Sequence, residues 1–185
     1  MRGARMARTL GRYDSLVTFV ESQTWLLPTL ARLIFTGVLS LYFFNSGLTK
    51  LGDGFLGILA PSTGAYVQIF PRAFEAVGYD TDGLGLFHDL IVLGGTLAEF
   101  ALPMLIIIGL FTRFAAIGMI GFVVLQSLTD VIGHGQTGVL GAWFDRFPDA
   151  AILDQRAFWV FVLLTLAVKG GGPLSLDRLI VARTR

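Results

Sequence analysis

The sequence predicts an all-α membrane protein, a four-transmembrane-helix bundle with both termini cytoplasmic. Of the 185 residues, 54% are hydrophobic and only 15% are charged, whereas a soluble domain normally carries about 25% charge. The apolar residues form long blocks, and the basic residues gather in the segments outside them. A chain of this length normally forms one domain, here with lipid around its apolar helices.

Three apolar blocks are long enough, or nearly so, to cross a bilayer. Residues 25–48 span about 36 Å as a helix, and residues 90–110 span about 31 Å. The stretch "LFTRF" then leaves room only for a tight turn, so residues 115–131 are expected to return antiparallel beside the second helix.

The fourth block, "AFWVFVLLTLAV", holds about 12 unbroken apolar residues, fewer than the ~20 of a usual span. It becomes long enough if its helix begins near Ala150, with Asp154 and Arg156 in the headgroup layer. Without this fourth span, the basic C-terminus would lie outside, against the positive-inside rule.

The basic residues divide the chain into three segments. Residues 1–24 form a basic cytoplasmic segment, residues 25–169 the bundle, and residues 170–185 a cytoplasmic end with a short helix capped by Ser175. The basic residues of the two termini and the tight turn are Arg2, Arg5, Arg8, Arg12, Arg113, Lys169, Arg178, Arg183 and Arg185. Only Lys50, Arg72, Arg146 and Arg156 fall in the two outer connections.

These two extracytoplasmic connections, residues 52–83 and 133–150, mix aromatic, apolar and acidic residues. Such segments tend to lie at the membrane surface with their rings at headgroup depth. We therefore expect short interfacial helices in both, with loose periplasmic loops as the alternative.

Two residues that are energetically unfavourable in lipid, Glu99 and Pro103, lie in the second span, within "GGTLAEFALPMLIIIGL". Pro103 has no N–H, so the carbonyl of Glu99 loses its helical partner, and lipid cannot replace it. The Glu99 carboxylate also needs polar company at this depth. With Gly95 one turn earlier, these residues predict a stripe that faces the other helices.

Arg32 is the expected counter-charge for Glu99. By the helical rise, Arg32 lies about 10 Å and Glu99 about 16 Å from the cytoplasmic end. We expect the two to pair directly or through water, with Lys50 on the same face as Arg32. The pair could fix helix register, or Glu99 could accept a proton or bind the polar head of a ligand such as a quinone.

A second polar group lies near the outer surface. His88 and Asp89 open the second helix, and Asp130 and His134 end the third, so we expect the four to be neighbours. They could hold a divalent metal, or the imidazoles a haem, although histidine at helix ends commonly has no ligand. Asn45, a ligand-site candidate, and Gln126 could instead hydrogen-bond between helices.

Several kinds of chemistry find no support in the sequence. Cysteine is absent, which excludes thiolate metal sites and iron–sulfur clusters held by this chain. No phosphate-binding glycine loop or nucleophile–base arrangement is visible, and no basic, aromatic-interleaved patch indicates a nucleic acid.

Three stretches resemble the DoxX family of bacterial membrane proteins. These are "RLIFTGVLSLYFFNSGLTKL", "LAEFALPMLIIIGLFTRFAA" and the closing "GGGPLSLD", with Trp143 where an aromatic residue is frequent. The resemblance implies a four-helix protein of the bacterial inner membrane. Its relatives include membrane subunits of thiosulfate:quinone oxidoreductase, which makes a quinone one candidate for a cofactor that the sequence does not identify.

Three functions follow from these observations. The first is a subunit of, or partner to, a quinone-linked redox complex, without catalysis by this chain alone. The second is a structural or assembly protein, or one that binds a small molecule or lipid. The third is a small-solute carrier, which is less favoured because the sequence shows no inverted repeat of the kind such carriers have. The expected partners are the lipid bilayer, other membrane or redox subunits, and a further copy of the chain.

Overall fold

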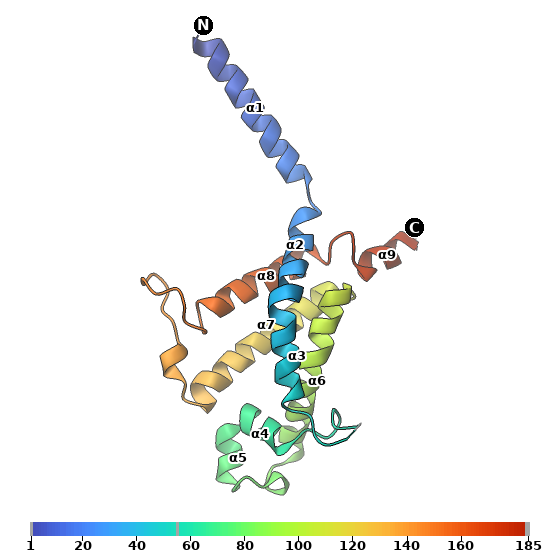
Figure 1. Cartoon of the computed structure of the whole chain (residues 1–185), viewed down its shortest axis with the longest axis vertical. Helices are drawn as coiled ribbons and strands as arrows, with labels where there is room; N and C mark the ends of the chain where they lie inside the picture. Colours follow the sequence, from blue (N-terminus) through green and yellow to red (C-terminus); the bar gives the residue numbers. More distant parts are fainter. Residues whose placement is uncertain (1, 55, 184–185) are drawn as a thin grey trace.

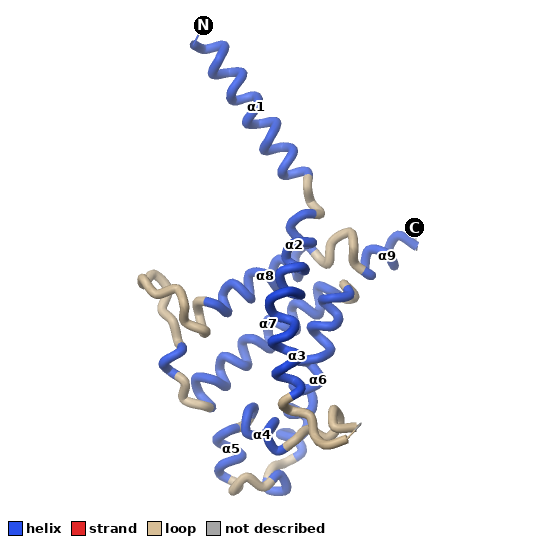
Figure 2. The backbone as a smooth tube through the Cα atoms, in the orientation of Figure 1, coloured by secondary structure: helices blue, strands red, loops and turns tan. Residues whose placement is uncertain are grey.

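The computed structural model describes residues 2–54 and 56–183, and this part of the chain is helical (Figures 1 and 2). Its one β feature there is an isolated bridge between Leu140 and Ile152. Met1 and residues 184–185, the ends of the predicted terminal segments, lie outside the described residues, as does Arg185 of the predicted charge bias. The elements are α1 Arg2–Ser22, α2 Leu26–Ile34, η1 Phe35–Leu39, α3 Ser40–Leu48, α4 Thr63–Ile69, α5 Pro71–Ala76, η2 Thr81–Gly83, α6 Leu86–Ile108, α7 Thr112–Leu128, η3 Thr129–Gly133, η4 Thr137–Val139, α8 Gln155–Lys169 and α9 Leu176–Arg183.

Among the described residues, three helices are long and apolar enough to cross a membrane. They are Leu26–Leu48, which joins α2, η1 and α3, then Leu86–Ile108, and Thr112–Gly133, which joins α7 and η3. These three confirm the first three predicted spans. Helix α1 extends away from the other helices in Figure 1.

The fourth predicted helix is shorter than the sequence suggests. Helix α8 has 15 residues, about 22 Å, and begins at Gln155, so a start near Ala150 is wrong. The loop before it is held in another shape, because Asp154 accepts a hydrogen bond from the Ala150 N–H and Leu153 has a φ of 74°. Neither Asp154 nor Arg156 is open to its surroundings; both are buried.

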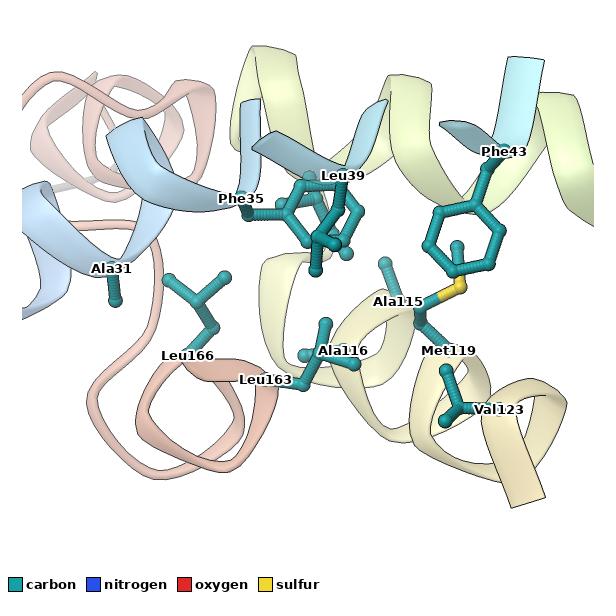
Figure 3. Packing of buried hydrophobic residues seen from close by; sticks show 11 residues of the cluster. Ala31, Phe35, Leu39, Phe43, Ala115, Ala116, Met119, Val123, Leu163 and Leu166 are labelled. Atoms are coloured by element: carbon teal, nitrogen blue, oxygen red, sulfur yellow. The ribbon is translucent and has the colours of Figure 1, made fainter. Parts of the chain in front are cut away.

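The main core lies where the first span meets α7 and α8 (Figure 3). Residues one helical turn apart on the first span, from Ala31 to Phe43, face this core because residues at i and i+4 share a helix face. The core residues are Ala31, Phe35, Leu39, Phe43, Ile106, Ala115, Ala116, Met119, Val123, Leu163 and Leu166. A second cluster, of Ala65, Tyr66, Phe74 and Val92, packs α4 and α5 onto α6.

The two long connections differ from one another. The first contains helices α4 and α5, which confirms the short helices predicted there. The second is mostly loop, with the short 3-10 helix η4 and the Leu140–Ile152 bridge, and so resembles the loop alternative more than the helices expected there. Because Ile152 donates its N–H to Val139 and accepts one from Gly141, this loop folds back on itself.

The chain after α8 closes one end of the bundle. The Asp177 carboxylate accepts hydrogen bonds from the Phe111 and Thr112 N–H groups and the Thr112 hydroxyl, at 2.7 to 2.9 Å, and so caps α7. Arg32 donates to the Leu174 carbonyl at 2.8 Å. Ser175 Oγ accepts from the Arg178 N–H, which confirms the predicted cap of α9.

Candidate functional site: a cavity around Glu99

Glu99 lies on the buried face of α6. Its exposure is 3%, and Pro103, one turn later, is also buried. The sequence-based prediction that this stripe faces protein is therefore confirmed. Gly95, the third member of the stripe, is half-buried and lies against Ile69 of α4.

The counter-charge of Glu99 is Lys50, which is 5% exposed and follows the end of α3. Lys50 Nζ donates to Glu99 Oε1 at 3.0 Å, and Ser46 Oγ donates to the same oxygen at 2.8 Å. Lys50 Nζ also donates to Ser46 Oγ at 2.9 Å and to the Ser46 carbonyl at 3.2 Å. The three side chains form a closed triangle of hydrogen bonds within the bundle.

The predicted pairing of Arg32 with Glu99 is wrong. Arg32 binds the Leu174 carbonyl and lies against Gly109, ten residues or about 15 Å along α6 from Glu99. The prediction placed the start of the first span and the end of the second span at one depth. In the structure Arg32 is level with the end of α6, so the first turn of α2 extends beyond the end of α6.

One oxygen of Glu99 is left without a hydrogen bond. Oε2 lies 3.0 Å from Lys50 Nζ, an ion-pair distance, but it accepts no hydrogen bond from a described residue. A buried carboxylate oxygen in this state has a free acceptor position.

A cavity of about 590 Å³ lies beside this ion pair, and Glu99, Lys50 and Ser46 form part of its wall. Most of the wall is apolar, which is typical of small-molecule sites. The remaining lining residues are Gln68, Ile69, Phe70, Leu90, Ile91, Gly94, Gly95, Ala98, Leu102, Gly118, Gly121, Phe122, Leu125, Gln126, Thr129, Asp130 and His134.

Glycines of α6 and α7 make room for this cavity. A Cβ atom added at Gly94 or at Gly121 would have no heavy atom within 4 Å, so both positions border open space. Gln126 also lines the cavity; it donates to the Tyr42 hydroxyl, while its own Oε1 accepts no hydrogen bond from a described residue. The helix-to-helix hydrogen bond predicted for Gln126 is thus confirmed.

The sequence model of the DoxX family matches residues 27–129, more than half of the chain and the segment that carries Lys50, Glu99 and most of the cavity wall. The chain belongs to the DoxX family. It is therefore a membrane protein whose apolar helices lie in a lipid bilayer. No curated protein and no solved structure matches this DoxX chain significantly.

The polar residues near the outer end of the DoxX bundle do not form the ligand set expected from the sequence. Asp89 accepts from the Tyr66 hydroxyl, Asp130 pairs with Arg156, and His134 Nε2 lies 3.0 Å from the Gln68 carbonyl. His88 packs edge-on against Phe70 and Phe87. Among the described residues no three His, Asp or Glu side chains gather as metal ligands.

Sequence reasoning missed Arg156 of the DoxX chain as an inward-facing residue. Arg156 is 8% exposed, donates to Asp130 Oδ2 at 2.7 Å and to Ser127 Oγ at 2.9 Å, and so joins α8 to the end of the third span. The sequence held one signal for this contact: Asp130 lies three residues after Ser127, so both side chains that bind Arg156 are on the same helix face. Asn45, by contrast, is exposed and does not line the cavity.

Tyr66 and Asp89 couple α4 to the start of α6 in this DoxX protein. The hydroxyl of Tyr66 donates to Asp89 Oδ1 at 2.8 Å. Burial, and then the nearby carboxylate of Asp89, raise the pKa of Tyr66 to about 12. Because the folded pKa exceeds the ordinary value of about 10, this contribution to stability is complete below pH 10 and is lost as the pH rises to about 12.

Replacing Tyr66→Phe should therefore destabilise the DoxX protein by about 1.5 kcal/mol near pH 8, the usual worth of a hydrogen bond to a charged group. The difference between wild type and variant should shrink between pH 10 and 12. Thermal unfolding in detergent at a series of pH values measures it. The exposed Tyr79→Phe is the control, and a gap of equal size at pH 8 and 12 would contradict the prediction.

Proposed function

We propose that this DoxX protein is a bacterial inner-membrane subunit of, or partner to, a quinone-linked redox complex, and that it binds the quinone-type ligand in the cavity around Glu99. The observation that carries the proposal is the buried Lys50–Glu99 ion pair in the wall of a largely apolar cavity. Catalysis by this chain alone is not part of the proposal, and the electron donor belongs to a partner subunit.

The chemistry of the cavity fits the reduced form of such a ligand. A quinol, which forms when a quinone takes up two electrons from the donor and two protons, carries two hydroxyl donors on a ring with apolar substituents. Two residues of the cavity wall carry a buried side-chain acceptor without a hydrogen bond from a described residue, Glu99 Oε2 and Gln126 Oε1. The donors of Lys50, by contrast, are engaged with Ser46 and Glu99, so they orient the carboxylate.

We further propose that α8 forms the fourth span, with both termini cytoplasmic. Arg156 near its start binds Asp130 at the end of the third span, and the Val168 carbonyl near its end accepts from Arg113 at the start of α7. Between Arg113 and Asp130 the third span runs about 26 Å. Helix α8 thus runs antiparallel to α7 over most of its length (Figure 1), which supports a crossing by a short helix.

The second candidate function is purely structural. The Lys50–Glu99 pair joins the end of α3 to the middle of α6, so it could serve only to fix how these helices pack. In that case the cavity would have no ligand to hold. Filling the cavity while leaving the ion pair intact separates the two functions.

Gly121→Leu should weaken quinol binding strongly without harming the fold. The side chain would extend into the open space beside Gly121, and leucine stabilises a helix by about 1 kcal/mol over glycine. We expect affinity for a short-tailed ubiquinol or menaquinol to fall at least about tenfold. Native mass spectrometry and ligand-dependent thermal shift in detergent measure it.

Gly37→Leu is the matched control, because Gly37 is exposed on the first span, has open space at its Cβ and does not line the cavity. It should bind quinol as the wild type does. Equal binding by wild type and Gly121→Leu would reject this site, and absence of any quinol binding by wild type would favour the structural function.

A further inference from the structure

A second cavity, of about 480 Å³, lies at the end of the bundle closed by Asp177. It shares no lining residue with the cavity around Glu99. Its wall comes from three parts of the chain: residues 24–28 at the start of the first span, residues 111–114 at the start of α7, and residues 169–181 after α8. The first two parts lie at the starts of candidate spans, and the third follows α8, the proposed fourth span, so the cavity is expected at the depth of lipid headgroups.

The charge of this second cavity is positive. Three basic residues line it, Arg113, Lys169 and Arg178, against a single carboxylate, Asp177. Asp177 is already engaged by two backbone N–H groups and a hydroxyl at the start of α7, so its oxygens are occupied. The site therefore offers more cationic groups than its own acid can neutralise.

Two of these cations are available to a ligand. Lys169 and Arg178 are exposed, and neither forms a salt bridge with a described residue. Arg113 uses Nη1 to bind the Val168 carbonyl at 2.7 Å, which holds its guanidinium at the cavity wall. An arginine with donors in a fork and a nearby lysine form a common arrangement for phosphate recognition.

The rim of the cavity is apolar and exposed. Phe111 comes from the α6–α7 turn, Phe114 from the first turn of α7, Trp25 from the start of the first span and Val181 from α9; all four are exposed. Tryptophan and other aromatic rings at headgroup depth lie against lipid. A ligand that satisfies both the cations and this rim has an anionic head and apolar chains.

We propose that this cavity binds the phosphate of an anionic phospholipid, with the acyl chains against the aromatic rim. Basic pockets between transmembrane helices are suited to such headgroups. The bound lipid would join the start of the first span, the α6–α7 turn and α9. A free phosphate would meet the same cations but would leave the apolar rim uncovered.

The test compares Arg178→Gln with Arg183→Gln. Both variants remove one arginine from α9, but Arg183 does not line the cavity. In delipidated protein, phosphatidylglycerol should raise the melting temperature more than phosphatidylcholine does for wild type and Arg183→Gln. This preference should fall by at least half in Arg178→Gln, and native mass spectrometry should find less retained phosphatidylglycerol.

Equal loss in the two variants would mean diffuse surface charge and would overturn the site. Inorganic phosphate that stabilises as well as phosphatidylglycerol would overturn the assignment to a lipid. If Arg178→Gln does not fold, Lys169→Gln serves in its place, because Lys169 is exposed and lines the cavity. Quinol binding is measured separately, so failure at either cavity leaves the other proposal standing.

Discussion

Replacing Lys50→Met should destabilise the protein by about 3 kcal/mol, because it leaves the carboxylate of Glu99 buried without its counter-charge. Both side chains are almost fully enclosed, at 6% and 3% exposure. The loss of free energy of unfolding is measured by titrating a mild detergent solution with a denaturing detergent. Thermal unfolding provides a second reading.

The double variant Lys50→Met/Glu99→Met should recover to within about 1 kcal/mol of the wild type, since two apolar side chains of similar volume replace the pair. The double-mutant cycle then gives the coupling between the two residues. Lys169→Met, at the other lysine of the chain, is the matched control, because that side chain is exposed and should cost little. Additive losses in the double variant would show that the ion pair is not a unit.

Gly109→Ala should have the second large effect, a loss of about 3 kcal/mol or more. Gly109 ends α6 with a φ of 72°, a backbone conformation that alanine adopts at a cost of about 1 to 2 kcal/mol. An added Cβ would also meet Arg32 Nη1 and would lie 2.8 Å from Ser175 Cα. Backbone cannot yield there as a flexible side chain would, so the chain after α8 would have to shift.

Gly135→Ala separates these two causes. Gly135 has a φ of 67° but open space around its Cβ position, so its alanine variant carries only the backbone cost, about 1 to 2 kcal/mol. The difference between the two variants in thermal unfolding measures the close contact of Arg32 and Ser175 with the end of α6. Equal losses would mean that this contact contributes nothing.

The stripe of Gly95, Glu99 and Pro103 could be predicted because each residue has a strict requirement in lipid. A carboxylate and a carbonyl without its helical partner must face protein, whatever the other helices do. The partner of Glu99 could not be predicted in the same way. Arg32 and Lys50 are both on the right face of the first span, and only the offset between the spans decides which of them is level with Glu99.

The start of α8 shows a similar limit. Hydropathy identifies the apolar block, but Asp154 bonds to the Ala150 N–H and Arg156 to Asp130, and these contacts place the first turn. The four polar residues of the outer end were expected together because their helices are neighbours. In the structure Tyr66 binds Asp89, Arg156 binds Asp130, and the Gln68 carbonyl lies beside His134. These partners come from other segments of the chain.

The sequence by itself determined that lipid surrounds this protein, where its three long spans lie, and which face of α6 points inward. The reason is that an unpaired polar group in hydrocarbon is unfavourable, and each segment must satisfy its own polar groups locally. The tertiary structure alone decided the ion-pair partner, the two cavities and the cap of Asp177 on α7. These depend on the relative depth and rotation of helices, which arise from packing between segments far apart in the chain.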